Sequence, residues 1–398
     1  MHSVGRSLFG RFSGDGQGFG VVCCSAAEHV APWCLPMPFT RPRRPLQRLI
    51  RAGVLALAGL LPLAAASAPS EAAALKLQIV GGLAGLTQYQ EYEQPFWTRE
   101  LARLSGGRYG ADIVPFDRAG VPGAEMLRLM ELGVVPFGTM LLSLTTMQYP
   151  EYAAIDLPGL SADMPQLRAN VTAFRPWLEN ALRERHGVRT LAIYVYPAQV
   201  VFCKRSLTRL ADLKGRRVRV SSVGQADFID ALGGVPVHTG FAQLMRSLES
   251  GDTECAITGT MSGHSLGLYR VTRYLYPLPV TWGLAIFGAN QTAWDALPPD
   301  LRELLGRELP RLERDIWAAA ERDTAEGVVC NSGAPACRKN DKGQMTVVPL
   351  SLHDTQLRRE ILQTVVLPRW VARCATDCAQ VWDRTLAAET GIHLSAPR

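Results

Sequence analysis

Apolar strands and amphipathic helices alternate along the chain from residue 75 onward. Residues 75–80 alternate between apolar and polar side chains, as a half-buried strand does. Residues 95–104 have apolar side chains at helical spacing, and they end at two glycines. Residues 109–115 predict a second strand and residues 124–132 a second helix. Strands and helices joined by short glycine-rich turns predict an α/β architecture with mainly parallel strands.

One strand region in the centre of the chain is divided by a proline. Residues 191–202 are almost entirely apolar, with Pro197 near their middle. Because proline interrupts a sheet ladder, this region predicts a strand that passes between two lobes. The alternation then continues with strands at 217–220 and 256–258 and helices at 226–232 and 242–249.

Residues 294–329 predict one very long helical stretch, which only Pro298-Pro299 and Pro310 interrupt. About 20 helical residues already span roughly 30 Å. The stretch is therefore longer than one compact lobe, and we expect it to brace two lobes against each other.

Residues 1–74 predict an N-terminal extension with a secretory signal. Five arginines between positions 41 and 51 precede an uncharged apolar run at 52–63, and small residues follow at 64–74. A basic start, a short apolar middle and a small-residue end are the parts of a cleaved signal peptide. We therefore expect a mature periplasmic chain that begins between Ser67 and Leu75.

Two features qualify the predicted signal. The alternative is a retained membrane helix, which needs about 20 predominantly apolar residues, whereas Pro62 interrupts this run. In addition, about forty residues precede the signal, although signals begin near the chain start. Met37 is therefore an alternative start of translation.

The charge of the protein is concentrated in its first part. Residues 1–74 contain seven arginines and three acidic residues, which is +4 of the formal net charge of +6. The remaining chain is nearly neutral, whereas a nucleic-acid-binding protein needs a basic surface. We therefore expect no nucleic-acid partner. Hydrophobic residues make up 47% of the chain and charged residues 20%, which is typical of a globular protein.

Six of the nine cysteines follow the predicted signal. An even number in an oxidising compartment indicates disulfides. The spacings of the last four cysteines do not fit the usual zinc-ligand pairs, so we favour disulfides over zinc for them. For Cys203 and Cys255, we favour two small buried hydrophobic side chains on separate strands. The expected disulfides are Cys330–Cys337 and Cys374–Cys378.

Several motifs between residues 156 and 302 carry a family resemblance. Leu210-Ala-Asp-Leu-Lys-Gly-Arg-Arg-Val-Arg-Val220 precedes Ala231-Leu-Gly-Gly-Val-Pro-Val237. A third motif, Asp156-Leu-Pro-Gly-Leu160, lies upstream, and Trp294-Asp-Ala-Leu-Pro-Pro-Asp-Leu-Arg302 lies downstream. A partial match at 241–251 has Gln and Met in place of the usual Glu and Tyr. Together they resemble the solute-binding proteins of tripartite ATP-independent periplasmic (TRAP) transporters, over roughly residues 75 to 380.

The resemblance implies a two-lobed periplasmic binding protein of the venus-flytrap type, with crossing strands and a long bracing helix. It assigns 75–197 plus 283–325 to lobe I and 198–282 plus 326–398 to lobe II. It implies a protein that captures a small organic acid and delivers it to an ion-gradient-driven TRAP membrane permease. It implies no enzyme activity, and we expect no cofactor and no metal.

The resemblance also implies ligand-binding residues on the second lobe. The register of the strand-entry motif places the family's ligand-pairing arginine at Arg219. A guanidinium suits this role because its planar fork of donors matches a carboxylate. Gln199 stands where sialic-acid-type members carry a second arginine, and Thr258 stands at the position of a family amide. Both are neutral, which favours a ligand with one carboxylate and nearby hydroxyl or keto oxygens. The alternative for Arg219 is a solvated strand edge shared with Arg217.

Three further residues are weaker candidates for the site. Trp282 either supplies an apolar wall where the chain recrosses between the lobes or is a core tryptophan. Gln88 and Ser143 follow first-lobe strands, and they either contact the ligand or are solvated loop ends.

A competing motif is Gly263-His264-Ser265-Leu266-Gly267, which fits the nucleophile elbow of a secreted α/β-hydrolase-type esterase. An aspartate and then a histidine follow in chain order, as a catalytic triad requires. However, no buried apolar strand directly precedes Gly263, and no oxyanion-loop motif lies upstream. We therefore favour the binding protein and expect that Ser265 is not a nucleophile.

Overall fold

The computed structural model describes residues 75–374 and 378–394. The predicted signal peptide, the alternative start at Met37 and three of the nine cysteines lie outside the described residues. Within the described part of the chain, no helix combines the length and apolar character that a bilayer span requires.

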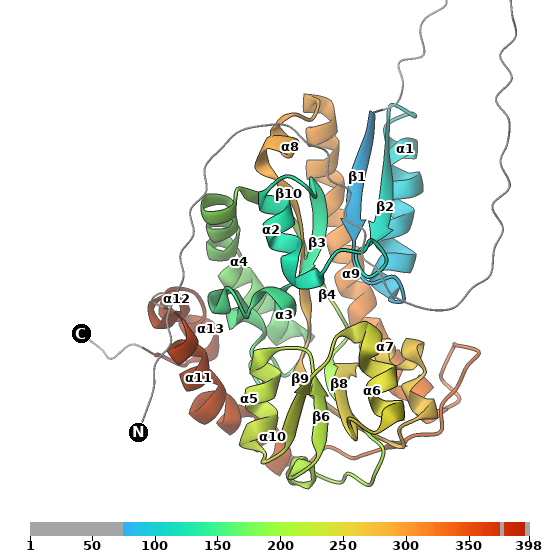
Figure 1. The fold of residues 1–398 in the computed structure, drawn as a ribbon, viewed down its shortest axis with the longest axis vertical. Helices are drawn as coiled ribbons and strands as arrows, with labels where there is room; N and C mark the ends of the chain where they lie inside the picture. The colour runs from blue at the N-terminus through green and yellow to red at the C-terminus, as the bar shows by residue number, and fades with distance from the viewer. Residues whose placement is uncertain (1–74, 375–377, 395–398) are drawn as a thin grey trace, which may run out of the picture. The chain divides into compact units, whose positions relative to one another are not determined.

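The first sheet carries the strands predicted at residues 75–80 and 109–115 (Figure 1). Its order is β2-β1-β3-β10-β4, and β1 is parallel to both β2 and β3. Strand β10 is antiparallel to both of its neighbours. The strands are β1 (Leu75–Gly81), β2 (Tyr109–Pro115), β3 (Phe137–Leu141), β4 (Val188–Val195) and β10 (Leu284–Asn290).

Helices and helical turns cover this sheet and complete the first lobe. The longest of those that lie wholly in this lobe is α4 (Met164–His186), which is N-capped by the Asp163 side chain and ends at Gly187 in the left-handed conformation. The others are η1 (Gln88–Glu93), η2 (Phe96–Glu100), α1 (Leu101–Leu104), η3 (Gly123–Glu125), α2 (Met126–Glu131), α3 (Leu142–Thr145), η4 (Pro150–Asp156) and α8 (Gln291–Asp295).

The second sheet has the order β11-β9-β5-β8-β6-β7. Its strands are β5 (Gln199–Cys203), β6 (Arg217–Val220), β7 (Val235–His238), β8 (Cys255–Gly259), β9 (Tyr274–Thr281) and β11 (Thr346–Val347). The helical elements between them are η5 (Leu210–Leu213), α5 (Val223–Ala231), η6 (Phe241–Gln243), α6 (Leu244–Ser250), α7 (Thr260–Leu266) and η7 (Leu268–Arg270).

The C-terminal region is helical after β11. Helices α12 and α13 contact α4 of the first lobe, so the end of the chain reaches back to it. The division of the chain between the two lobes stays a prediction, with residues 75–197 plus 283–325 in lobe I and residues 198–282 plus 326–398 in lobe II. The elements are α10 (Leu352–Ile361), η8 (Leu362–Val366), α11 (Leu367–Arg373), α12 (Cys378–Thr385) and α13 (Ala387–Thr390).

The chain passes directly from a strand of one sheet to a strand of the other at two crossings, which lie side by side. Strand β4 of the first sheet leads into β5 of the second, and β9 of the second leads into β10 of the first. The backbone N–H of Tyr196 in one crossing donates to the carbonyl of Gly283 in the other, at 3.0 Å. The crossing strands are antiparallel to most of their neighbours. The sheets are therefore mixed: five of the nine strand pairings between described residues are parallel and four are antiparallel, so the expected parallel strands form only a narrow majority.

Helix α9 (Pro299–Ser332) runs along both lobes, as the predicted bracing helix does (Figure 1). Its 34 residues span about 51 Å. Trp317 Nε1 donates to the carbonyl of Ile193 on β4 at 2.8 Å, and Asn331 Nδ2 donates to that of Thr260 on α7 at 2.9 Å. Pro310 lies inside the helix without ending it, so the predicted interruption at this proline was wrong.

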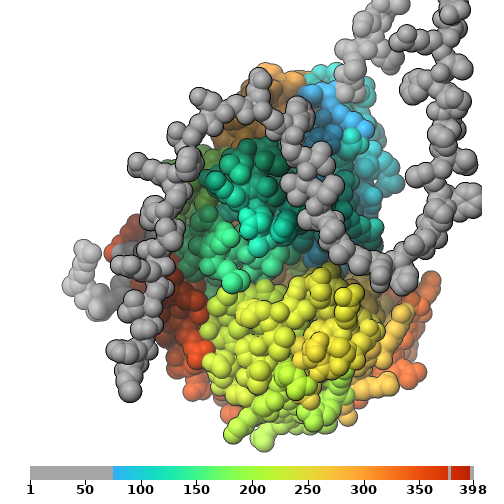
Figure 2. Space-filling model, viewed as in Figure 1, coloured from blue at the N-terminus to red at the C-terminus, as the bar shows by residue number. Residues whose placement is uncertain are grey.

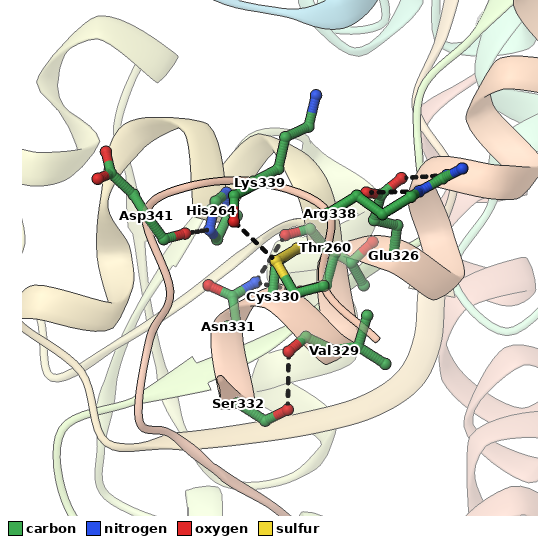
Figure 3. The surroundings of a disulfide bond; sticks show 12 residues. Thr260, His264, Glu326, Val329, Cys330, Asn331, Ser332, Arg338, Lys339 and Asp341 are labelled. Atoms are coloured by element: carbon green, nitrogen blue, oxygen red, sulfur yellow. Dashed lines mark hydrogen bonds and ion pairs between the residues drawn. A yellow bond between two sulfur atoms is a disulfide. The ribbon is translucent and has the colours of Figure 1, made fainter. Parts of the chain in front are cut away.

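Three disulfides link the six described cysteines. Cys330–Cys337 and Cys374–Cys378 agree with the expected pairs. The first closes the loop after α9, where Arg338 pairs with Glu326 and the Asp341 carbonyl lies 2.7 Å from His264 Nε2 (Figure 3). The zinc alternative does not apply to these cysteines.

Cys203 and Cys255 form the third disulfide, which corrects the expectation of two separate hydrophobic side chains. Both cysteines are buried in the core. They occupy directly paired positions of the neighbouring strands β5 and β8. Separation in sequence hid this pairing, because only the strand order of the second sheet brings the two residues together.

Candidate functional site

A cavity of about 590 Å³ is lined by residues of both lobes. On the face shown in Figure 2, the surface of the second lobe, in yellow and green, adjoins that of the first lobe, in teal. The carboxyl ends of β1, β2 and β3 lead into first-lobe lining residues, and those of β6, β7 and β8 into second-lobe ones. Ligands of α/β proteins commonly bind in a crevice outside the carboxyl ends of strands. The cavity is therefore the candidate site.

Arg219 is the buried cation of this cavity. It lies on β6 between Val218 and Val220, whose side chains are buried in the core, and only 3% of Arg219 is exposed. Its Nη1 donates to the carbonyl of Ile257 and its Nε to that of Thr239, both at 2.8 Å. Two carbonyl oxygens thus fix the plane of the guanidinium.

No carboxylate pairs with Arg219 among the described residues. Burial lowers the pKa of Arg219 to about 10, so the side chain is still charged at neutral pH. One N–H of Nη1 and both N–H groups of Nη2 have no protein acceptor within the described chain, since a guanidinium has five donors. The arrangement suits a carboxylate from outside the protein, because a buried unpaired charge is costly.

Arg217 has a different environment, although it lies on the same strand face in the sequence pattern. Its side chain is exposed, and it donates to the carbonyls of Asp252 and Gly251 at 2.9 Å. The solvated strand edge expected as the alternative for Arg219 therefore describes Arg217.

Gln199, Thr258 and Ser143, three of the candidate ligand-binding residues, also line the cavity. The amide nitrogen of Gln199 donates to the carbonyl of Trp282 at 3.3 Å and that of Pro197 at 3.4 Å. Thr258 is 2% exposed, and its hydroxyl makes no hydrogen bond to another described residue. These three polar side chains are neutral, and Arg219 is the charged hydrogen-bond donor that lines the same cavity.

Gln88 and Trp282 do not line the cavity. Gln88 is buried, and its Nε2 donates to the carbonyl of Val195 at 3.2 Å. Trp282 is also buried, and its indole Nε1 donates to the carbonyl of Ser161 at 3.2 Å. Both side chains tie first-lobe segments to the crossings, and the structure does not bring them to Arg219.

Asp156 is a cavity residue that the sequence analysis did not select, although it begins the Asp156–Leu160 motif. One of its oxygens accepts the backbone N–H of Trp282 and the other that of Gly283, both at 2.8 Å. Burial raises the pKa of Asp156 to about 7, although these two hydrogen bonds act against the rise. The carboxylate thus holds the second crossing and faces the cavity.

Gln225 is a second residue that was missed, and it orders the loop after β6. Its Oε1 accepts from the backbone N–H and the hydroxyl of Ser221, and its Nε2 donates to Thr281 Oγ1 at 2.9 Å. Nothing in the sequence marks it, because its function depends on the contact between α5 and the end of β9.

The esterase motif does not have the geometry of a nucleophile elbow. Gly263 and Ser265 lie inside α7, one turn or more after the strand β8 has ended. Ser265 is exposed and does not line the cavity. A nucleophile elbow requires the serine at the strand-to-helix turn itself. Within the described residues, no group of three or more potential ligands is placed to hold a metal ion.

Two lobes joined by paired crossings, with a buried unpaired arginine at the cavity between them, define the class of ligand-capturing binding proteins. Residues 84–366 match the family of bacterial extracellular solute-binding proteins, family 7 (DctP), and the chain belongs to this family. Membership confirms the predicted resemblance and the location outside the cytoplasm. No curated protein matches the sequence.

Solved structures confirm the two-lobed α/β fold. The Bordetella pertussis receptor DctP7, described as binding pyroglutamic acid, is 20% identical with a TM-score of 0.68, over 78% of this chain and 99% of its own. A Desulfovibrio salexigens TRAP protein with bound orotic acid is 15% identical with a TM-score of 0.68, over 77% and 96%. One from Rhodoferax ferrireducens with bound malonate is 19% identical with a TM-score of 0.68, over 79% and 98%.

Proposed function

We propose that this protein captures a small organic acid outside the cytoplasm and delivers it to an ion-gradient-driven TRAP permease. Arg219 binds the carboxylate, and Gln199 and Thr258 contact the neutral polar part of the ligand. The observation that carries the proposal is the buried Arg219 guanidinium, which has free donors and no carboxylate partner among the described residues. The ligands of the similar structures, pyroglutamate, orotate and malonate, are all carboxylates.

The same geometry supports a binding role without catalysis. Ser265 is exposed on α7 and outside the cavity, and it lies away from a strand-to-helix turn. The cavity lining combines the Arg219 cation and the acidic residues Asp117 and Asp156 with neutral polar and apolar side chains. Of these groups, the Arg219 guanidinium suits reversible capture of an anion. The position of Arg219 on β6 of the second lobe, opposite first-lobe lining residues, lets a bound acid favour lobe closure.

The test is a thermal-shift screen of the mature protein with organic acids, followed by calorimetry of the acids that bind. Each charge-assisted hydrogen bond is worth about 1.5–3 kcal/mol, so losing two in Arg219→Ala should weaken binding roughly a hundredfold or more. Arg219→Lys should restore only part of the affinity, because an ammonium keeps the charge and loses the planar fork.

Arg217→Ala is the matched control, since it removes an arginine from the same strand outside the cavity. It should bind the same acid as tightly as the wild type. If Arg219→Ala binds the acid within about threefold of the wild type, the carboxylate does not bind at Arg219 and the proposal is wrong.

A further inference from the structure

Two side chains beside the second crossing offer hydrogen-bond acceptors to the cavity. The first is Asp156, whose two carboxylate oxygens each accept one backbone N–H, from Trp282 and Gly283. A carboxylate has about four acceptor positions, so both oxygens keep capacity for a further donor. Because Asp156 lines the cavity, a ligand can supply that donor.

The second acceptor belongs to Gln199. Its amide nitrogen faces two backbone carbonyls, those of Pro197 and Trp282, and only an N–H group can bond to both. This orientation makes Oε1 the free end of the amide, and Oε1 has no partner among the described residues. Gln199 therefore offers the cavity an acceptor, although an amide elsewhere offers both kinds of group.

Both side chains meet at Gly283, which has a φ of +78°. Gly283 donates its N–H to Asp156, and a Cβ at this position would lie 3.2 Å from Gln199 Nε2. The absence of a side chain thus lets the amide and the carboxylate approach the same backbone turn. We call Asp156 and Gln199 the acceptor corner.

We propose that the acceptor corner selects carboxylate ligands that carry a hydroxyl or N–H donor in addition to the carboxylate. The inference rests on the carboxylate-binding function proposed above. A keto oxygen at the corner would supply no hydrogen, so Gln199 Oε1 would lack a donor and the Asp156 oxygens would keep only their two backbone donors. A site built to bind a polar group discriminates strongly against an analogue that lacks it, because its buried groups are then unpaired.

The neighbouring Thr281 favours a hydroxyl as the donor group. Thr281 is paired with Gln199 across β9 and β5, and it lines the cavity. Its Oγ1 accepts from Gln225 Nε2, so its own hydrogen is available to donate. A ligand hydroxyl can donate to the corner and accept from Thr281 at once, whereas a keto oxygen can only accept.

The experiment measures calorimetric dissociation constants for pairs of acids that share a carbon skeleton. The probes are lactate and pyruvate, 4-hydroxypentanoate and 4-oxopentanoate, and 4-hydroxycyclohexanecarboxylate and 4-oxocyclohexanecarboxylate. The pairs place the donor at increasing distance from the carboxylate. At pH 8 the Asp156 carboxyl is mostly ionised. In at least one pair, the wild type should bind the hydroxy acid about tenfold or more tightly than the oxo acid.

Three variants separate the acceptor corner from the rest of the cavity. Gln199→Met and Asp156→Asn should each reduce the preference to below about threefold. Gln243→Met makes the same change at a cavity-lining glutamine outside the acceptor corner, and it should keep the preference within about twofold of the wild type. Gln199→Met keeps the test decisive if Asp156→Asn does not fold, since Asp156 also holds two backbone N–H groups.

Loss of the preference in a folded corner variant, with the preference of Gln243→Met unchanged, supports the proposal. Equal binding of hydroxy and oxo acids by the wild type, or a preference that persists in every folded corner variant, overturns it. In those cases Arg219→Ala still abolishes binding, so the carboxylate site stands. If no acid of any pair binds the wild type, the proposed role of the acceptor corner is overturned. If the wider screen of organic acids is also negative, the proposed function is wrong as well.

Discussion

Replacing Arg219 by methionine is expected to leave the stability of the ligand-free protein nearly unchanged while it abolishes carboxylate binding. Arg219 is 3% exposed, and no described carboxylate compensates its charge. A buried charge without a counter-charge costs folding free energy that a bound anion would offset. Methionine has a similar length and no charge, so it removes this cost and leaves most of the packing in place.

The magnitude follows from the pKa and from the two hydrogen bonds. Burial lowers the pKa of Arg219 from 12.5 to about 10, which corresponds to about 3 kcal/mol against the charged form. Because the folded-state pKa is the lower one, the whole penalty is present at every pH below about 10. The lost bonds to the carbonyls of Ile257 and Thr239 are charge-assisted too, and they act in the opposite direction by at least about 1.5 kcal/mol each. The two effects nearly cancel, so the free energy of unfolding should change by about 1 kcal/mol or less, or roughly 4 °C or less in Tm.

The assay is urea and thermal unfolding at pH 7.5 of protein that has been unfolded and refolded to remove bound acid. Arg217→Met is the control, because it deletes an exposed arginine that also bonds to two backbone carbonyls. It should leave the free energy of unfolding unchanged or slightly lower it, by about 0.5 kcal/mol or less. If Arg219→Met is instead less stable than the wild type by about 3 kcal/mol or more, the charge of Arg219 is not an uncompensated cost.

Three further substitutions test the frame around the site. Gly327→Ala should lose about 1–3 kcal/mol of stability in urea unfolding, because a Cβ there would lie 2.3 Å from the backbone nitrogen of Met261. Gly306→Ala is the control in an open part of the same helix, and it should gain up to about 1 kcal/mol. Equal effects of the two substitutions would contradict the close contact of α9 with α7. Burial raises the pKa of Glu93 from 4.5 to about 7, so the folded state binds the proton more tightly and stability should fall as pH rises through 7. Glu93→Gln should remove about 3 kcal/mol of this change between pH 5 and 8, and an unaltered pH profile would refute the assignment. Ser265→Ala should leave any ester hydrolysis by the pure protein unchanged, since Ser265 is exposed on α7; an esterase activity lost in this variant would contradict the binding role.

The local pattern of apolar and polar residues predicted the strands that have one buried and one more exposed face. Strand β2 begins and ends where residues 109–115 were expected, and β1 extends its prediction only by Gly81, because both alternate between buried and exposed side chains. The helix at residues 95–104 is real but belongs to a longer helical segment that begins at Gln88. No prediction was made for α4, where polar residues and Pro176 obscure the apolar spacing.

Only the part of the candidate site that lies within a single sequence motif was predictable. The strand-entry motif led to Arg219, but its burial depends on β7 and β8, which lie on either side of β6. The Cys203–Cys255 bond, the bonds of Asp156 to the second crossing and the contact of Gln225 with Thr281 join segments 52 or more residues apart. Such pairs are set by tertiary packing, which a local pattern does not contain.

The hydrogen bonds that orient Arg219 leave its positive charge without a counter-charge from the described residues. Arg175, in the first lobe, donates from both Nη1 and Nη2 to the Glu313 carboxylate, at 2.6 and 2.9 Å, so the protein itself occupies its fork. Arg219 is oriented instead by two carbonyl oxygens, which accept hydrogen bonds without cancelling the charge. A carboxylate beside Arg219 would stabilise the empty protein, but a ligand would then have to displace it. Orientation by neutral acceptors makes the guanidinium rigid before a ligand arrives, so that the anion we propose to bind there gains both the charge and the geometry.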